Sequence, residues 1–332
     1  MIVNGMSESL GFNRVAMECL GPDASVSASV AVLLCTRNGE RFLDEQITSI
    51  VRQTHQNFKI YVSDDGSSDS TRAIVNAHIE RWGHDCIELF EGPLKGFARN
   101  FLSVSCREDV EADYYAWCDQ DDVWNEDKLK VALDWLASGD ASVPALYCSR
   151  TELIDESGQA IGFSSAFSKP AKFQNALVQN IAGGNTMVFN QALMALIREA
   201  GASVPVASHD WWAYMIVSGC NGRINYDLTP TVRYRQHSLN CIGSNRGFRN
   251  NSKRVRELWR GRYRSWIDNN IISLQVISHR FGAENRQALE CFSAARKEGL
   301  FKRVWGFKRS GIYRQTLVGH LGLLFAMIVR RV

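Results

Sequence analysis

The feature that most constrains this chain is a series of short apolar runs separated by segments with helical spacing. Val30–Cys35 is a continuous apolar run, which is typical of a strand buried on both faces. Similar runs occur at Phe58–Val62, Ile87–Phe90 and Tyr114–Cys118. Between them, apolar residues recur with the period of a helix, as in Ile74–Ile79. Strands that alternate with helices predict an α/β fold with a mixed, mostly parallel central sheet.

Polar clusters follow three of these predicted strands. Thr36-Arg37-Asn38 comes after the first strand, Asp64-Asp65 after the second and Asp119–Asp122 after the fourth. Ligands of such sheets bind at the carboxyl ends of the strands, so we expect one site there. Asp119–Asp122 holds three carboxylates in four residues, which repel one another when they are buried. A divalent cation such as Mg²⁺ or Mn²⁺, or a shared proton, would relieve that cost, and the alternative is a solvated loop.

Composition sets broad limits on the class of protein. The 332 residues are enough for one large core, with or without a smaller appendage, and 45% hydrophobic residues are ordinary for a globular protein. The nine cysteines form no Cys-x-x-Cys pair, which argues for a reducing cytosol and against disulfides or a zinc site. Residues 1–27 show no signal-peptide pattern. Leu317–Val329 is too short for a membrane span of about 20 residues but could lie in an interface.

The pattern predicts three regions. Residues 1–27 are read as a loose extension, 28–245 as a catalytic domain with halves at 28–140 and 141–245, and 246–332 as a basic helical region. In the second half we expect a hairpin over Leu153–Phe163 and separate strands at Arg223–Tyr226 and Val232–Tyr234. The last region holds 19 of the 38 Lys and Arg against five acids, which suggests an anionic membrane surface or nucleic acid.

Several common enzyme motifs are missing. The sequence has no Gly-x-Gly-x-x-Gly after its first strand, no phosphate-binding Gly-x-x-x-x-Gly-Lys-[Ser/Thr] and no Gly-x-Ser-x-Gly. A dinucleotide-binding fold, a P-loop enzyme and an α/β-hydrolase are therefore disfavoured. A phospho-receiver domain also has strand-end acids, but it would be far shorter and would have a lysine where Cys148-Ser149-Arg150 stands.

Four segments, taken together and in order, resemble family 2 glycosyltransferases of the GT-A fold, over about Val30 to His237. They are Thr36-Arg37-Asn38-Gly39, Asp64–Thr71, Gly96 with Ala98-Arg99-Asn100, and Asp119–Asp122. Three segments are similar to the rhamnosyltransferase-like branch, which builds bacterial surface polysaccharides such as O-antigen. They are Cys118–Trp124, His209–Trp212 and Tyr234–Asn240.

The resemblance implies an inverting, metal-dependent transferase that uses a nucleotide-diphosphate sugar, either dTDP-rhamnose or a UDP-sugar. It assigns Thr36, Asn38, Asp65, Arg99, Asn100 and Asp119 to the nucleotide and donor, and Asp121, Asp122 and His237 to the metal. Asp65 would accept from the imide nitrogen of the base. Asp121 occupies the second acid of the family's Asp-x-Asp, and which of Asp121 and Asp122 binds the metal stays open. A turn or loop role is the alternative for Asp65 and for His237.

On the acceptor side, the resemblance implies that Asp210 is the general base, with a helix N-cap role as the alternative. Gly184 is expected to serve backbone conformation or to lie beside the acceptor. Trp211 and Trp212 would offer flat faces for sugar stacking, with core packing as the alternative. Because acceptors of this branch are usually lipid-linked, the basic region is expected to meet an anionic membrane surface rather than nucleic acid. The protein would then be cytoplasmic and peripheral at the inner face of the cytoplasmic membrane. A catalytically inactive module that binds sugar nucleotides is a further alternative, although none of the acids is lost.

Overall fold

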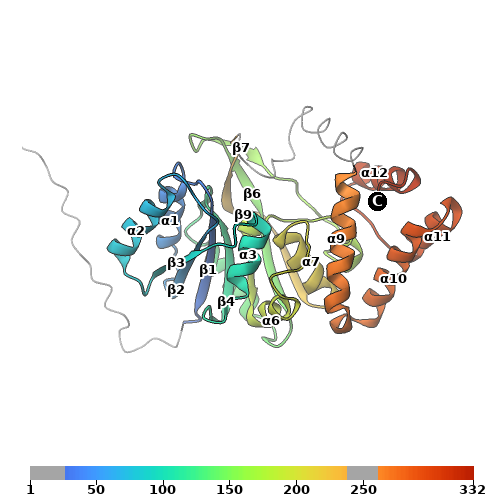
Figure 1. Cartoon of the computed structure of the whole chain (residues 1–332), viewed down its shortest axis with the longest axis horizontal. Helices are drawn as coiled ribbons and strands as arrows, with labels where there is room; N and C mark the ends of the chain where they lie inside the picture. Colours follow the sequence, from blue (N-terminus) through green and yellow to red (C-terminus); the bar gives the residue numbers. More distant parts are fainter. Residues whose placement is uncertain (1–26, 238–260) are drawn as a thin grey trace, which may run out of the picture.

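The computed structural model describes residues 27–237 and 261–332. The predicted loose extension, apart from its last residue, the end of the Tyr234–Asn240 motif and residues 246–260 of the basic region lie outside the described residues. Within the described part, nine strands form one sheet with the order β3-β2-β1-β4-β8-β6-β9-β5, and β7 pairs with β6 (Figure 1). The strands are β1 Val30–Thr36, β2 Phe58–Asp64, β3 Ile87–Glu91, β4 Tyr114–Asp119, β5 Val123–Trp124, β6 Ala145–Ile154, β7 Ala160–Phe163, β8 Val188–Asn190 and β9 Arg223–Arg235.

Helices cover the sheet and continue beyond it at the carboxyl end of the chain (Figure 1). They are α1 Leu43–Val51, α2 Thr71–Trp82, α3 Phe97–Ser105, α4 Lys128–Ala137, α5 Phe173–Ala176, α6 Gln191–Ala200, α7 His209–Gly219, α9 Arg262–Ile277, α10 Ala283–Lys297, α11 Leu300–Ser310 and α12 Leu317–Ile328, with short 3₁₀ turns η1 Gly184–Thr186 and η2 Ser278–Arg280.

The sheet confirms the predicted mixed α/β architecture. Strands β1 to β4 pair in parallel, whereas β8 runs antiparallel to both β4 and β6. The hairpin expected over Leu153–Phe163 is formed by β6 and β7. The prediction of two strands at Arg223–Tyr226 and Val232–Tyr234 is wrong, because β9 runs through both along β6, with an irregularity between Ser149 and Thr151.

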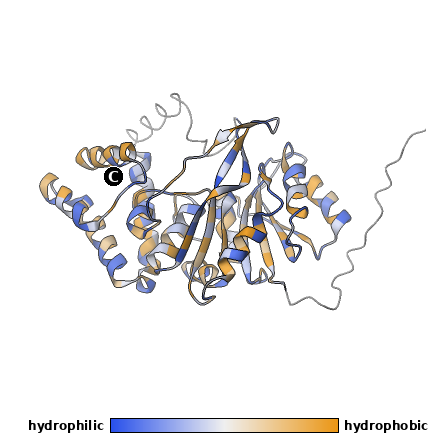
Figure 2. Ribbon diagram, turned by 180° about the vertical axis from the view of Figure 1, so that it is seen from behind, coloured by the Kyte–Doolittle hydropathy of each residue, from blue (hydrophilic) through white to orange (hydrophobic). Residues whose placement is uncertain are grey.

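Strand β1 explains why its sequence is apolar without interruption. Alternate residues of a strand point to opposite faces. Val30, Val32 and Leu34 contribute to the core beneath α1, α2 and α4. The other face carries Ala31 and Leu33, which belong to the core shared with α3, α6 and α7. Figure 2 shows apolar residues along the strands, between the helices that cover the two faces of the sheet.

The helices after residue 260 share a core with the second half of the sheet. Ile267 and Leu274 of α9 are buried in the same cluster as α6 and α7. The Asn270 side chain accepts a hydrogen bond from Ala207 N at 3.1 Å. Among the described residues, no helix is both long enough and apolar enough to cross a membrane. The described part of the predicted basic region, from residue 261 on, therefore joins the main core through α9, and α10 and α11 extend outward from α9 (Figure 1).

Candidate active site

The carboxyl ends of β1, β2 and β4 lie side by side. Thr36 is in register with Asp64 across the β1–β2 pair, and Cys35 is in register with Asp119 across the β1–β4 pair. The three polar clusters that the sequence places at strand ends therefore gather at one edge of the sheet. This geometry is what a single ligand site at the strand ends requires.

Side chains join the three loops at this edge into one frame. Gln120 Oε1 accepts a hydrogen bond from Arg37 N at 2.8 Å, and its Nε2 donates to Arg37 O at 3.0 Å. Asn38 has a φ of 50°, and its Oδ1 accepts from Ser68 N at 2.9 Å. The role of Gln120 was not predicted, because nothing in the sequence marks a glutamine between two acids as a loop connector.

Two of the predicted donor-binding side chains take part in this frame. Thr36 is buried and its hydroxyl donates to Asp64 Oδ1 at 3.0 Å. Asn100 is also buried, where its Nδ2 donates to Ser63 O at 2.8 Å and its Oδ1 accepts from Ser63 Oγ at 2.6 Å. That these two side chains contact the nucleotide stays a prediction, because the structure shows only their bonds inside the protein. Their bonds hold α3 and the β1 loop against β2.

Asp65 and Arg99 stay predictions as donor residues. Asp65 accepts from Leu94 N at 2.5 Å and from Gly96 N at 2.8 Å, and Arg37 Nη1 lies 3.9 Å from its Oδ2. A carboxylate oxygen has more than one lone pair, so these bonds do not prevent a further donor from binding. Arg99 Nη1 donates to Ala202 O at 2.5 Å, which directs the guanidinium toward the loop between α6 and α7.

The structure separates the roles of Asp121 and Asp122. Asp122 is fully buried, with one carboxylate oxygen accepting from Arg235 N at 3.1 Å and the other from Asn185 Nδ2. The metal assignment of Asp122 stays a prediction, and its burial and two hydrogen bonds favour Asp121 over Asp122 as the ligand. Asp121 is 17% exposed, and its Oδ2 lies 2.8 Å from His237 Nε2. Asp121 and His237 stay predictions as metal ligands.

The acids at this edge repel one another. Burial, followed by the charges of Asp121 and Asp210, raises the pKa of Asp119 to about 8. Burial and the neighbouring acids Asp121 and Asp119 also raise the pKa of Asp122 well above its ordinary value. A site that opposes its own negative charge this strongly favours a cation. The carboxylate oxygens of Asp121 and the imidazole of His237 are ligand types that suit Mn²⁺ or Mg²⁺.

These residues fit a cation that is held partly by the substrate rather than one enclosed by protein ligands alone. Within residues 27–237 and 261–332, no three His, Cys, Asp or Glu side chains form a ready-made cluster. Mg²⁺ is commonly held by one or two carboxylates together with substrate phosphates and water. The pair of Asp121 and His237 is enough for a site of that kind.

Asp210 approaches the same site from a separate segment. It lies in the first turn of α7 and is largely buried. Its Oδ1 accepts from Trp211 N at 2.7 Å, which orients the carboxylate. Asp210 is close enough to Asp119 for its charge to contribute to the raised pKa of that residue. The structure thus brings the predicted base and the predicted donor acids together.

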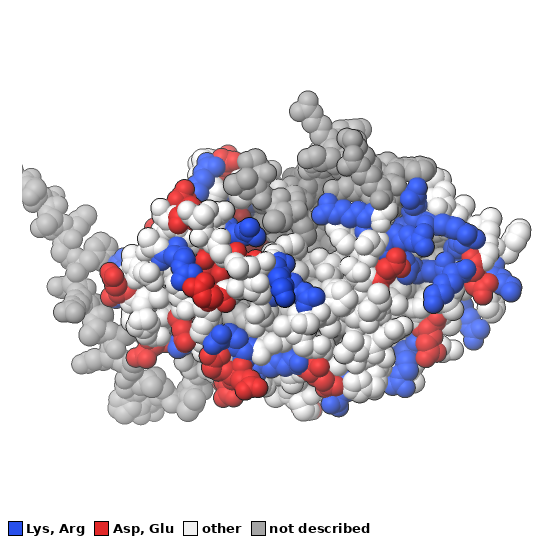
Figure 3. Space-filling model, in the orientation of Figure 1, with Lys and Arg blue, Asp and Glu red and all other residues white. Residues whose placement is uncertain are grey.

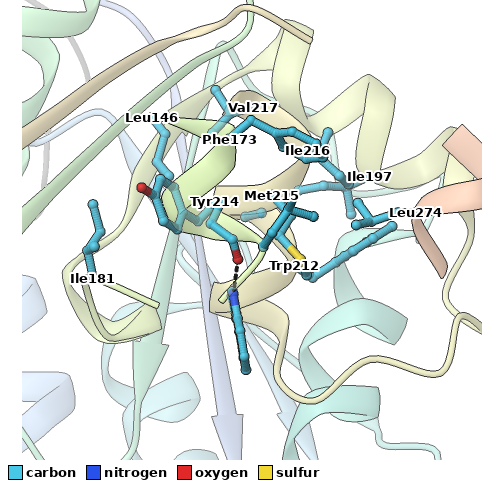
Figure 4. Packing of buried hydrophobic residues seen from close by; sticks show 14 of the residues in the cluster. Leu146, Phe173, Ile181, Ile197, Trp212, Tyr214, Met215, Ile216, Val217 and Leu274 are labelled. Atoms are coloured by element: carbon cyan, nitrogen blue, oxygen red, sulfur yellow. Dashed lines mark hydrogen bonds between the residues drawn. The ribbon is translucent and has the colours of Figure 1, made fainter. Parts of the chain in front are cut away.

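Trp211 and Trp212 are both buried. Every residue of α7 is buried. Trp211 Nε1 donates to Ala176 O at 2.6 Å, and Trp212 is fully buried. Figure 4 shows Trp212 in the cluster that contains Ile197, Met215 and Leu274. Their burial favours the core-packing alternative, and a stacking role on the acceptor stays a prediction.

Gly184 packs against His209, a residue whose position the sequence did not reveal. A Cβ at Gly184 would lie only 2.3 Å from His209 Nε2. The His209 ring stacks on Phe101 at a centroid distance of 3.8 Å and meets the Trp117 ring edge-on at 4.7 Å. Neither ring nitrogen of this buried histidine has a hydrogen-bond partner among the described residues. The assignment of Gly184 to the acceptor stays a prediction, while its contact with His209 is a structural reason for glycine.

His209 predicts a measurable pH effect. Burial lowers the pKa of His209 to about 4, against a smaller opposing effect of Asp210. Its unfolded pKa is about 6.5, so between these values the unfolded chain binds the extra proton. The contribution of the neutral His209 side chain to the free energy of unfolding is fully present above the unfolded pKa. It is lost as the pH falls toward the folded pKa. As the pH falls across this window, the free energy of unfolding of the unsubstituted chain should drop by about 3 kcal/mol more than that of His209→Gln.

Urea unfolding at a series of pH values measures this difference. His279→Gln is the control, because His279 is exposed and lies 2.8 Å from Glu199 at the surface. If the free energies of unfolding of His209→Gln and the unsubstituted chain fell in parallel as the pH falls, the lowered pKa of His209 would be wrong.

Comparison with known proteins agrees with this geometry. The solved structure of GalNAc-T7 with UDP, GalNAc and Mn²⁺ has a TM-score of 0.53 to this chain at 7% identity, covering 88% of this chain and 56% of that one. The fold is that of the GT-A class of glycosyltransferases. The model of glycosyl transferase family 2 matches residues 31–200, and the chain belongs to this family. The phospho-receiver alternative is therefore excluded.

Curated relatives extend the likeness. The dTDP-rhamnosyl transferase RfbG of Shigella flexneri is 28% identical over 261 residues, which is 75% of this chain and 88% of that protein. A putative teichuronic acid biosynthesis glycosyltransferase of Bacillus subtilis, TuaG, is 28% identical over 109 residues, or 32% of this chain and 41% of that protein. The chain is thus a glycosyltransferase that resembles the rhamnosyltransferase-like branch.

Proposed function

We propose that the chain transfers a sugar, with inversion, from a nucleotide-diphosphate donor to a hydroxyl of a growing bacterial surface glycan such as O-antigen. The observation that carries the proposal is the gathering of Asp119, Asp121 and Asp210 at the carboxyl edge of the sheet. The donor is dTDP-rhamnose or a UDP-sugar, and the likeness to a dTDP-rhamnosyl transferase supports the first. The acceptor is lipid-linked or an oligosaccharide.

In this proposal the donor is held by the loops after β1, β2 and β4. Asp65 and Asp119 bind the base and the ribose, while Asn38 keeps the two neighbouring loops in place. Asp121 and His237 hold Mg²⁺ or Mn²⁺. A bound divalent cation would offset the charge that develops on the diphosphate as the sugar leaves.

Asp210 removes the proton of the acceptor hydroxyl as the oxygen attacks the sugar carbon. A hydroxyl is a weak nucleophile, and a positioned base contributes roughly 10²–10⁴-fold to the rate. The bond from Trp211 N to Asp210 Oδ1 holds the carboxylate in one orientation. Inversion requires that the base act from the face opposite the departing diphosphate, which a residue from a separate segment can do.

Nucleotide titration tests the donor and metal assignments. We expect UDP or dTDP to bind in the presence of Mn²⁺, and Asp121→Asn or His237→Ala to weaken that binding by roughly 10–100-fold. Asp122→Asn is the informative contrast, since it should lower the melting temperature yet keep the dependence on Mn²⁺. Isothermal titration calorimetry with each nucleotide, with and without the metal, measures these effects. The absence of binding of both nucleotides under every metal condition would overturn the proposal.

The site of action belongs to the same proposal. A lipid-linked acceptor places the enzyme in the cytoplasm, peripheral at the inner face of the cytoplasmic membrane, with the region 246–332 against anionic lipid. No nucleic-acid partner is expected. The excess of basic residues in this region supports the membrane contact.

A further inference from the structure

Helix α12 exposes a continuous apolar face. Three of its residues, Leu323, Ala326 and Met327, are buried against the rest of the protein. The opposite side carries six exposed apolar residues, namely Leu317, Val318, Leu321, Leu324, Phe325 and Ile328. These positions recur three and four residues apart, so they form one stripe along the helix. Leu317 is 71% exposed and Val318 is 82% exposed, which is unusual for residues of this type.

Helix α11 exposes a second apolar group that includes aromatic rings. Phe301 is 89% exposed and Trp305 is 64% exposed, and Leu300 and Val304 lie beside them on the same helix. The buried guanidinium of Arg303 donates to Met327 O at 3.1 Å, which connects α11 to the end of α12. Aromatic rings of this kind are enriched where a protein meets the lipid–water interface.

The segment that forms α11 and α12 carries charge of one sign. From residue 299 to residue 332 the sequence contains seven Lys and Arg and no Asp or Glu. Lys302, Lys308 and Arg309 are exposed on α11, and Arg330 is exposed just after α12. Figure 3 shows Lys and Arg gathered at this end of the molecule, with a few Asp and Glu among them, on the face that it displays.

We propose that the exposed faces of α11 and α12 are a docking surface for an anionic lipid bilayer, with α12 lying in the plane of the interface. An anionic bilayer offers both an apolar interior and a negative surface, and the two helices are complementary to both. A second copy of the chain is a poorer match, because a symmetric contact through this surface would bring the same basic residues together. The inference rests on the proposed function in that a lipid-linked acceptor would be presented at such a surface.

Vesicle flotation of the full chain tests the docking surface. We expect little binding to phosphatidylcholine alone and at least about tenfold stronger partitioning when phosphatidylglycerol is included, with the gain lost at high salt. The double variant Val318→Glu/Leu321→Glu should lower partitioning into the anionic vesicles by about tenfold or more. Both side chains are exposed, so the melting temperature should stay close to that of the unsubstituted chain.

The matched control places the same charge on apolar surface elsewhere. Leu228 is 55% exposed on β9 and Ile161 is exposed on β7, so Leu228→Glu/Ile161→Glu should bind vesicles as the unsubstituted chain does. Equal binding by the α12 variant and this control would overturn the docking surface. So would a concentration-dependent dimer, seen by sedimentation without lipid, that the α12 variant dissociates while neither vesicle type binds.

The two proposals fail in different ways. A chain that binds nucleotide with Mn²⁺ but never binds vesicles keeps the proposed function and loses the docking surface. A chain that binds anionic vesicles through α12 but binds neither UDP nor dTDP loses the proposed function alone.

Discussion

Asp210→Asn is expected to lower the rate of sugar transfer by roughly 10²–10⁴-fold while nucleotide binding stays largely intact. The amide has nearly the same shape as the carboxylate, and its oxygen can still accept from Trp211 N. It cannot take the proton of the acceptor hydroxyl. Nucleotide release from the donor in the presence of acceptor measures the rate, and calorimetric titration of the nucleotide measures binding.

The control for this variant is Asp140→Asn. Asp140 also accepts from a backbone N–H, that of Ser142 at 2.8 Å, but it is exposed and lies in the loop after α4. The Asp140→Asn variant should transfer sugar at the rate of the unsubstituted chain. If Asp210→Asn also transferred sugar at that rate, Asp210 would not be the base and the proton would have to leave by another route.

Gly184→Ala is the second substitution with a large expected effect. Its methyl group would lie 2.3 Å from His209 Nε2, so the ring or the η1 turn must move. Phe101 and Trp117 confine that ring on two sides, and any shift is passed to Asp210, the next residue. We expect a loss of about 1–3 kcal/mol of unfolding free energy from overpacking. A displaced base should also reduce transfer by roughly 10²-fold.

Urea unfolding and the transfer assay measure the two effects. Gly299→Ala serves as the control, because a Cβ at Gly299 meets nothing within 4 Å. Combining Gly184→Ala with His209→Ala removes the clash. The unfolding free energies of the two single variants and the double variant should then show favourable coupling of about 0.5–3 kcal/mol. Purely additive losses would mean that Gly184 does not act through His209.

Local patterns were sufficient to predict much of the donor side. The apolar runs marked β1 to β4, and the clusters after β1, β2 and β4 meet at one edge because parallel strands end on the same side of a sheet. Asp119 and Asp121 lie there as expected. Their surroundings could not be predicted, since hydrogen bonds such as those of Asp122 join residues far apart in the chain.

The acceptor side shows where pattern reasoning stops. His209-Asp210-Trp211-Trp212 indicates a helix start, and α7 begins there. Which faces of that helix are covered depends on elements packed around it, including α5, α6 and α9. With all faces covered, α7 lacks the one-sided pattern that distinguishes a core tryptophan from a surface one. The sugar-stacking role was therefore assigned to rings that are buried.

The acids of Asp119–Asp122 illustrate which features of this protein follow from the sequence and which follow from the tertiary structure. The sequence by itself determined that these carboxylates follow a buried strand, and hence that they lie at the ligand-binding edge of an α/β sheet. The tertiary structure decided that Asp122 is fixed by Asn185 and the backbone of Arg235, while Asp121 is left to face His237. The physical reason is range: strand periodicity is set by neighbouring residues, whereas burial and hydrogen-bond partners are set by segments more than 60 positions away.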